Sequence, residues 1–325
     1  MQMSDDRRRF RRWCAVLAVP AFLFVLAACG GDDGRAEPST EPVTQPADEG
    51  PAQIAALSSD AAEAVRTLVG AERLVAVPES TSNEHLGNHA DEMAQVPNHV
   101  PSSANVDPEQ VLSWDPDLVV VTARHDGEQD AGELLEQADV PLVTIENNWG
   151  SIEQLQDNYR TIGEALGAVD RADKLIAEME ADLAELADQL DGADEPSVLV
   201  LTNQASDPFI AGPGSMPTDI VRHAGGAPVV DGSEISRTMP AEPEQIVGLE
   251  PDAILLVDVL GRGEESFDGL LGNEAVAQLD AVENGRIMTL PGRSAMAAGG
   301  VHVVDGVRDV ATWLHPGDGL EEGGA

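Results

Sequence analysis

Two glutamates, Glu109 and Glu244, occupy matching positions in a motif that the chain repeats 135 residues apart. In each copy the glutamate follows a proline, and eight residues after that proline a Pro-Asp pair leads into an apolar run. Proline suits the first position of a helix, where its missing N–H leaves no hydrogen bond unmade. A carboxylate at the start of such a helix can make charge-assisted hydrogen bonds to a cation. The repeat predicts two similar lobes, each with one such carboxylate.

Cys29 is the second residue whose setting indicates chemistry. Five arginines precede an apolar run over residues 13–28 that is too short to span a bilayer comfortably. This pattern is typical of an export signal, and its end, Leu26-Ala27-Ala28-Cys29, looks like a lipobox. We therefore expect residues 1–28 to be removed and Cys29 to carry lipid. The arginines leave both the general secretory and the twin-arginine export routes open.

The mature chain is expected to contain no free thiol. Cys14 leaves with the signal and Cys29 takes the lipid, so no cysteine is left for disulfides, zinc-cysteine sites or thiol catalysis. Residues 29–52 are rich in Gly, Asp, Glu, Pro, Ser and Thr, which predicts a disordered acidic tether. A short disordered tail is expected over residues 317–325.

The chain is extremely acidic. It has 59 acidic and 18 basic residues, a formal net charge of −41. Loss of residues 1–28 removes two acids and five arginines and leaves −44. Nothing basic is available to neutralise phosphates, which excludes a nucleic-acid-binding protein. The acids are scattered, as in a solvated acidic coat.

The order of elements predicts an α/β fold with two parallel-sheet lobes. Apolar runs alternate with short helical patterns over residues 53–150 and again over residues 193–316. Between them, residues 151–192 carry the strongest helical periodicity in the chain, broken near Gly167. Ser151 and Gln154 form a capping-box-like start. A second helix of about 20 residues spans roughly 30 Å, so we expect a stiff strut that joins the lobes and limits hinge closure.

Taken together, these features resemble the helical-backbone (class III) substrate-binding lipoproteins of ABC importers for ferric siderophores, heme or vitamin B12. The resemblance rests on the lipobox, the two lobes, the connecting helix, the paired glutamate motif, and residues 207–212 leading to the Ala-Gly-Gly at 224–226. It covers roughly residues 53–315.

The resemblance implies a non-enzymatic receptor with no resident cofactor. Its ligand would be an iron chelate, a ferric siderophore, with heme or vitamin B12 (cobalamin) as alternatives of the same fold. The protein would be monomeric, extracytoplasmic and lipid-anchored to the outer face of the cell membrane. It would deliver its ligand to a permease dimer with its ATPase. Glu109 and Glu244 would each meet an arginine of the permease. Thr122 and Thr238 stand where members of the family place aromatics, which weakens a B12 assignment.

We expect the ligand between the lobes, at the carboxyl ends of the strands, where open α/β sheets bind ligands. Arg124 and Arg293 can pair with carboxylate or catecholate oxygens, and Trp149 and Phe209 can pack on an apolar rim. The predicted ligand residues are Ser80, Arg124, His125, Trp149, Phe209, Met216, Arg262, Arg293 and Met296.

Other classes remain open at this point. Heme needs an axial ligand, for which His125, Met216, Met296 and His302 are available, while the sole tyrosine, Tyr159, falls in a helical core stripe. A free-metal receptor of the zinc type would use His85, His89 and His99, although Gly87 and Asn88 make a helix there doubtful. A structural surface lipoprotein is a further alternative. No nucleophile elbow, phosphate loop or HExxH motif indicates an enzyme.

Overall fold

A computed structural model describes residues 50–101, 106–124, 126–203 and 207–317. The predicted signal, Cys29, nearly all of the tether and tail, and His125 lie outside these ranges. Within them, no helix is both long and apolar enough to cross a membrane.

Lobe one contains a wholly parallel sheet in the strand order β3-β2-β1-β4-β5. Its interior strand β4 has the sequence LVVVT and is buried at every residue, as expected of a strand rich in β-branched residues and covered on both faces. The strands are β1 (Ile54–Ala56), β2 (Leu74–Pro78), β3 (Asn98–Val100), β4 (Leu118–Thr122) and β5 (Leu142–Ile145). The helices are α1 (Ser59–Val69), η1 (Ala71–Arg73), η2 (Glu79–Ser82), α2 (Ala90–Met93), α3 (Pro108–Leu112) and α4 (Asp126–Glu136).

Lobe two contains a mixed sheet in the order β11-β10-β6-β7-β9, with β8 paired to β6. Its strands are β6 (Ser197–Thr202), β7 (Phe209–Ile210), β8 (Ala227–Pro228), β9 (Met239–Pro240), β10 (Ala253–Asp258) and β11 (Ile287–Pro291). The helices are α7 (Met216–His223), α8 (Pro243–Leu249), η4 (Gly263–Ser266), α9 (Asp268–Leu271), η5 (Val276–Gln278), α10 (Asp280–Glu283), α11 (Gly292–Ala295), η6 (Ala297–His302) and α12 (Val303–Leu314).

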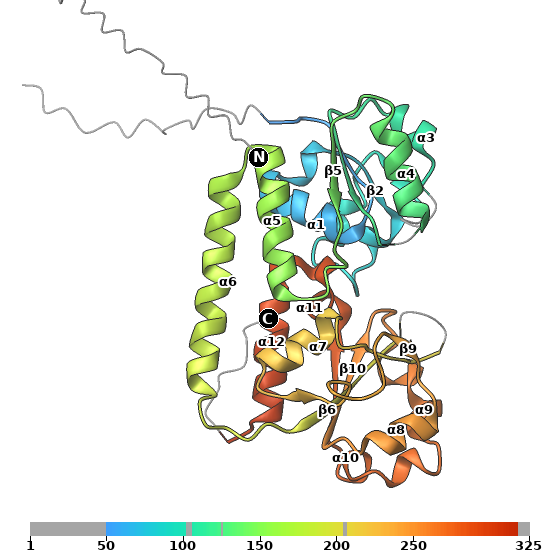
Figure 1. The fold of residues 1–325 in the computed structure, drawn as a ribbon, viewed down its shortest axis with the longest axis vertical. Helices are drawn as coiled ribbons and strands as arrows, with labels where there is room; N and C mark the ends of the chain where they lie inside the picture. Colours follow the sequence, from blue (N-terminus) through green and yellow to red (C-terminus); the bar gives the residue numbers. More distant parts are fainter. Residues whose placement is uncertain (1–49, 102–105, 125, 204–206, 318–325) are drawn as a thin grey trace, which may run out of the picture. The chain divides into compact units, whose positions relative to one another are not determined.

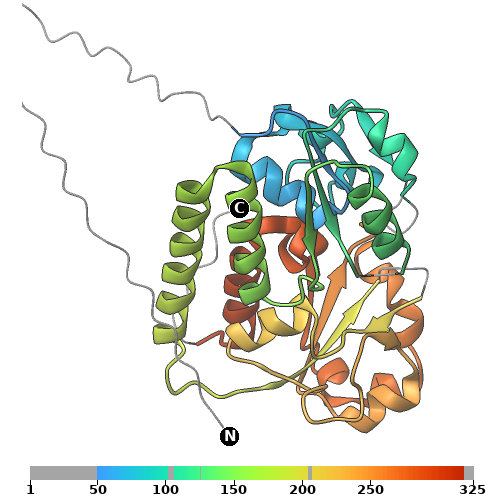
Figure 2. The ribbon, with the colours of Figure 1, turned by 45° about the horizontal axis from the view of Figure 1, so that its top comes forward.

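Two helices connect the lobes. Helix α5 (Ile152–Leu166) begins with the predicted cap, since the Ser151 hydroxyl accepts a hydrogen bond from the Gln154 N–H at 3.1 Å. It ends at Gly167, which has φ of 70°, a conformation that favours glycine. Helix α6 (Val169–Gln189) then runs back beside α5 (Figures 1 and 2) and also contacts α12. The predicted pair of helices is therefore present, folded as a hairpin along the lobes.

One apolar core passes through both lobes. It contains Ile54 and Val120 of the first sheet, Tyr159 of α5, Ile176 of α6 and Leu255 of the second sheet, all nearly inaccessible to solvent. Separating the lobes along this path would expose apolar surface to water, at a free-energy cost of about 25 cal/mol for each Å² exposed. The continuous core therefore opposes separation of the lobes, and the stiffness of the connection stays a prediction.

The sequence patterns differ from the structure in two places. Parallel sheets were predicted for both lobes, but β7 and β9 pair antiparallel at one edge of the second sheet. These strands have two residues each, too few to show a pattern. Strand β3 was missed because its three residues, Asn-His-Val, carry little apolar signal.

Candidate functional site

The carboxyl ends of β1 and β4 and the loop after β5 meet around Thr122. The Thr122 hydroxyl lies 2.8 Å from the Ser58 hydroxyl and accepts a hydrogen bond from the Trp149 indole Nε1 at 3.2 Å. All three side chains are buried, and the Trp149 side chain is only 1% exposed. We expected Trp149 on an open loop as a rim for a ligand. Its indole N–H is hydrogen-bonded within the protein and its ring belongs to the apolar core, so Trp149 packs inside the fold instead of forming an open rim.

Arg124 follows β4, as predicted, and has an anionic partner within the same lobe. Its Nη1 lies 2.8 Å from Oδ2 of Asp60 on α1. The Arg124 side chain is 24% exposed and that of Asp60 only 9%. The carboxylate of Asp60 therefore offsets the arginine charge, and an anionic ligand at this position would share the guanidinium with it.

Ser80 lies in η2 at the edge of a small pocket. Its hydroxyl is 2.6 Å from the hydroxyl of Ser59. The pocket has room for about one water molecule. It brings lobe one, including Glu63, next to Ala298 of η6 in lobe two.

In lobe two, the predicted methionines and Phe209 lie mostly inward. Met216 starts α7, is 3% exposed and belongs to the core, so it is not presented on a loop as we expected. Met296 is half-buried and packs against the same core. Phe209 is half-buried on β7, opposite Thr202 of β6. Only a rearrangement of α7 would bring the Met216 thioether to a ligand.

Asp258 and Asn203 shape the loop after β10 that carries Arg262. Asn203 donates to Asp258 at 2.6 Å, and its amide oxygen accepts the N–H of Val259 at 2.6 Å. The Asp258 carboxylate accepts the N–H groups of Arg262 at 3.1 Å and Gly263 at 2.7 Å. These hydrogen bonds lower the pKa of Asp258, in opposition to burial, which raises it. The network holds the loop in place while the Arg262 side chain stays exposed.

Residues 83–88 of lobe one form a segment that reaches lobe two, which we call the bridging segment. Asn83 donates to the carbonyl of Val259 at 3.3 Å. Asn88 donates to the carbonyls of Arg293 at 3.0 Å and Gly299 at 3.2 Å. In return, the N–H of Arg293 donates to the carbonyl of His85 at 2.9 Å. Arg293 thus lies on α11 directly beside the lobe boundary, with an exposed side chain.

The paired glutamates start matching helices. Asp107 caps α3 by accepting the N–H of Glu109 at 3.0 Å, and Pro108 takes the first helical position. Helix α8 likewise begins with Pro243 and Glu244. Both glutamates are exposed. Helices α3 and α8 both lie on the side of the fold away from α6 (Figure 1). Two separate carboxylates are therefore offered to the surroundings, one from each lobe.

The histidine arrangement argues against a zinc-type site among the described residues. His89 Nδ1 lies 3.1 Å from Glu63, while His99 Nε2 lies 3.2 Å from the carbonyl of Met93. Within the described ranges, no group of three or more His, Cys, Asp and Glu side chains is placed to hold a metal ion. Tyr159 is 1% exposed, in agreement with the predicted core position.

The comparisons with known proteins give the family. A family model described as periplasmic binding protein matches residues 54–294. The chain belongs to this family. It is the substrate-binding protein of an ABC transporter, a non-enzymatic transport component that works outside the cytoplasm with a permease, an ATPase and a small-molecule ligand.

Individual relatives agree with this assignment. An uncharacterized ABC transporter substrate-binding lipoprotein, YvrC of Bacillus subtilis (strain 168), is 24% identical over 95% of this chain and 98% of its own length. The apo periplasmic heme-binding protein RhuT from Roseiflexus sp. RS-1 has a TM-score of 0.68 at 24% identity, over 83% of this chain and 100% of that one. A periplasmic heme-binding protein from Pseudomonas aeruginosa has a TM-score of 0.68 at 22% identity, over 82% of this chain and 94% of that one. These structures confirm the two-lobe class III fold.

Sequence reasoning missed Glu63, Asn203 and Asp258. Asp258 ends an apolar strand with a carboxylate, a signal that could have been read. Glu63 lies in α1, where alanines surround it and nothing in the pattern marks it as buried.

Proposed function

We propose that this periplasmic binding protein captures an anionic iron chelate of the ferric siderophore type. The supporting observation concerns arginine placement in a very acidic chain. From residue 50 onward there are twelve lysines and arginines, and three of them, Arg124, Arg262 and Arg293, follow the carboxyl ends of β4, β10 and β11. Open α/β sheets bind ligands at these ends, and guanidinium groups pair well with carboxylate, hydroxamate or catecholate oxygens.

Among these three, Arg262 and Arg293 suit the role best. Both side chains are exposed, whereas Arg124 is already paired with Asp60. The backbone of Arg262 is held by Asp258, and that of Arg293 by the bridging segment. Backbone held in this way lowers the entropy cost of presenting a guanidinium to the chelate.

Heme is the second candidate, because heme-binding proteins are among the similar solved structures. Of the axial ligands named from the sequence, Met216 is buried in the core and Met296 is half-buried against it. His302 is already 2.9 Å from Asp305.

Intrinsic tryptophan fluorescence tests both candidates. The mature protein is titrated with ferric hydroxamates, ferric catecholates, heme and cobalamin. Trp149 lies beside the strand ends, so a chelate there should quench its emission, and a Trp149→Phe variant should lose that signal while it keeps affinity by calorimetry. Saturable binding of a ferric chelate supports the proposal. A Soret band that the Met296→Ala change removes would reassign the ligand to heme.

Lipid anchoring at Cys29 and docking through Glu109 and Glu244 complete the proposed cycle. The anchor would keep the receptor near its permease, and the exposed carboxylates would pair with one arginine on each membrane subunit. We propose a monomer as the working unit, with the two lobes each contacting one subunit of the permease dimer.

A further inference from the structure

A buried carboxylate lies where the two lobes join. Glu63 on α1 is 4% exposed, in a region where α1 packs against η6 of lobe two. Its Oε1 lies 3.1 Å from Nδ1 of His89 and accepts a hydrogen bond from the Thr67 hydroxyl at 3.3 Å. Burial of a carboxylate without a full ion pair is unfavourable unless the group is protonated.

Tyr159 and Gly300 close the cluster from the other elements. The Tyr159 hydroxyl on α5 is buried and has no hydrogen-bond partner in the described part of the chain. A Cβ atom at Gly300 of η6 would lie 2.9 Å from both the Glu63 side chain and the Tyr159 hydroxyl. Gly300 has φ of 62° and ψ of −133°, a conformation that is essentially glycine-only. Three elements, α1, α5 and η6, therefore meet at Glu63, and they leave no space for a side chain at Gly300.

Other charged groups surround this cluster. The His302 ring of η6 lies 6.1 Å from the His89 ring, and its Nδ1 is 2.9 Å from Asp305. Arg308 also lies 3.8 Å from Asp305. On the side of lobe one, Arg66 pairs with Glu92 at 2.8 Å. Asp60, one turn before Glu63 on α1, pairs with Arg124.

The same place anchors the bridging segment. His89 follows directly after residues 83–88, whose hydrogen bonds reach Val259, Arg293 and Gly299 of lobe two. A change at the Glu63–His89 contact is therefore transmitted to backbone hydrogen bonds between the lobes.

We propose that Glu63 and His89 form a proton-dependent joint between the lobes. With Glu63 protonated and His89 neutral, the contact between α1 and η6 stays closed. Ionisation of Glu63 places a charge at a site where no cation contacts it directly. Opening of the joint to water then lowers the free energy, because water can solvate the carboxylate. Ambient pH thus sets how firmly lobe two is held against lobe one.

Electrostatics agrees with the geometry. Burial raises the pKa of Glu63 to about 7, against the opposing effect of Arg66. Burial also lowers the pKa of His89, and Arg66 and His302 act in the same direction. Near neutral pH the histidine is therefore uncharged, and the proton of Glu63 is the one that changes.

Hydrogen–deuterium exchange of the whole mature protein tests the joint. Peptides from α1 and from η6 are followed at about pH 6 and about pH 8.5, with rates corrected for intrinsic exchange. We expect protection in wild type to fall by roughly tenfold or more across this interval. Glu63→Gln mimics the protonated side chain and should keep its protection. Glu79→Gln, at an exposed glutamate on η2, is the matched control and should behave like wild type.

Equal pH dependence in wild type and Glu63→Gln would overturn the joint. If Glu63→Gln does not fold, a titration of the wild-type protein alone still tests the proposal. Carbon-13 NMR of the glutamate side-chain carboxyls should show one group that titrates near pH 7. If every glutamate titrates near the ordinary value of about 4.3, the proposal is wrong.

Discussion

The guanidinium of Arg124 lies 2.8 Å from the carboxylate of Asp60, an ion pair at the carboxyl end of β4 whose acid is almost fully buried. In lobe two, no acidic side chain among the described residues forms such an ion pair with Arg293. Arg293 instead meets the carbonyls of the bridging segment, with Nη1 donating to Glu84 at 3.5 Å. Both arginines follow the carboxyl end of a parallel strand, β4 for Arg124 and β11 for Arg293, and yet they differ in what their loss would do.

Replacing Arg124 should mainly affect stability. Arg124→Ala leaves the buried Asp60 without its cation, which typically costs about 3–5 kcal/mol for a fully buried pair and less here because the arginine is partly exposed. Arg293→Ala should leave stability within about 0.5 kcal/mol and weaken an anionic chelate by about 1.5–3 kcal/mol. Urea unfolding and calorimetric titration separate the two effects. The reverse pattern would mean that Arg124 contacts the ligand.

Gly300 should not tolerate a side chain. Gly300→Ala forces a Cβ against Glu63 and Tyr159 and into a backbone region that L-residues avoid, so we expect a loss of about 2–3 kcal/mol. Gly167→Ala is the control, because it also has positive φ but no atom within 4 Å of the added Cβ. That change should cost only about 1–2 kcal/mol. Equal midpoints of unfolding would show that the crowding at Gly300 relaxes at no cost.

Much of the fold was predictable because its signals are local. Helix α5 has a cap, an apolar stripe and a terminal glycine within 17 residues, and each reinforces the others. Strands β4 and β10 are continuous apolar runs introduced by Pro-Asp. The short strands β7, β8 and β9 have two residues each and form because longer neighbours hold them, so no local pattern identifies them.

The candidate site was less predictable, since its properties depend on contacts between distant residues. Arg124 was placed correctly after β4, but its pairing with Asp60 is a property of the folded lobe. Trp149 and Met216 follow loops in the sequence, and they turn inward because core space lies behind them. Glu63 is buried where α1 packs against η6, and the first residue of η6, Ala297, lies 234 residues further along the chain.

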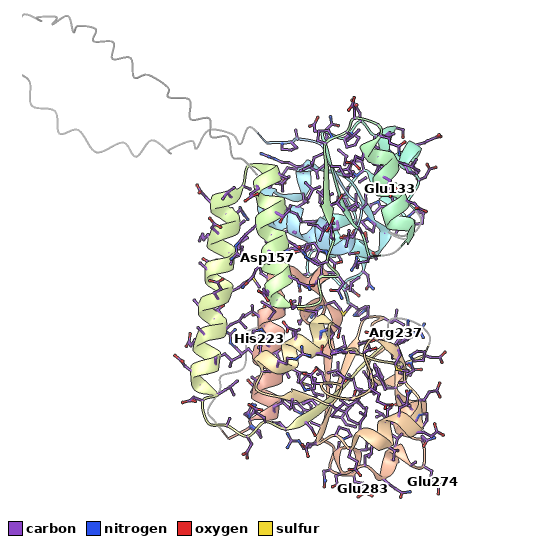
Figure 3. The ribbon with its side chains drawn as sticks, in the orientation of Figure 1. Glu133, Asp157, His223, Arg237, Glu274 and Glu283 are labelled. Atoms are coloured by element: carbon purple, nitrogen blue, oxygen red, sulfur yellow. The ribbon has the colours of Figure 1, made fainter. Side chains whose placement is uncertain are left out.

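Docking through Glu109 and Glu244 can be separated from ligand binding. The double change Glu109→Ala with Glu244→Ala should leave chelate affinity unchanged and abolish most uptake, because an unpaired arginine at each permease contact costs about 2–5 kcal/mol. Glu133→Ala with Glu274→Ala is the control, since both side chains project from the surface, one from each lobe (Figure 3). Uptake of labelled chelate into cells measures the difference. Wild-type transport by the docking double variant would refute the role.

Anchoring at Cys29, which lies outside the described residues, is tested by fractionation. The lipobox predicts that the wild-type protein stays with membranes after a high-salt wash, because an acyl anchor does not depend on charge. Cys29→Ala should appear in the soluble fraction or remain as an unprocessed precursor. Recovery of a processed Cys29→Ala protein in washed membranes would show that another feature holds it there.

The stability of the protein should fall as the pH rises through neutrality, and Glu63 should account for the effect. Its pKa is raised from 4.5 to about 7 in the folded protein. Between these two pH values the folded state therefore keeps a proton that the unfolded state has lost. The contribution is fully present below about pH 4.5, declines above it and is gone once the pH passes about 7. At about 1.4 kcal/mol per unit, the full loss is about 3 kcal/mol.

Glu63→Gln should remove this pH dependence. The amide carries no charge at any pH, so above pH 7 the variant should unfold at a higher temperature than wild type and the difference should shrink as the pH falls toward 4.5. His89, whose pKa is lowered, acts in the opposite direction below its ordinary value of 6.5, and His89→Gln should therefore stabilise the protein only on the acid side. Calorimetric melting from about pH 5 to about pH 8.5 measures both. Parallel melting curves for wild type and Glu63→Gln across this range would show that Glu63 ionises at the same pH in the folded and unfolded states, and the buried carboxylate would then have no part in setting stability.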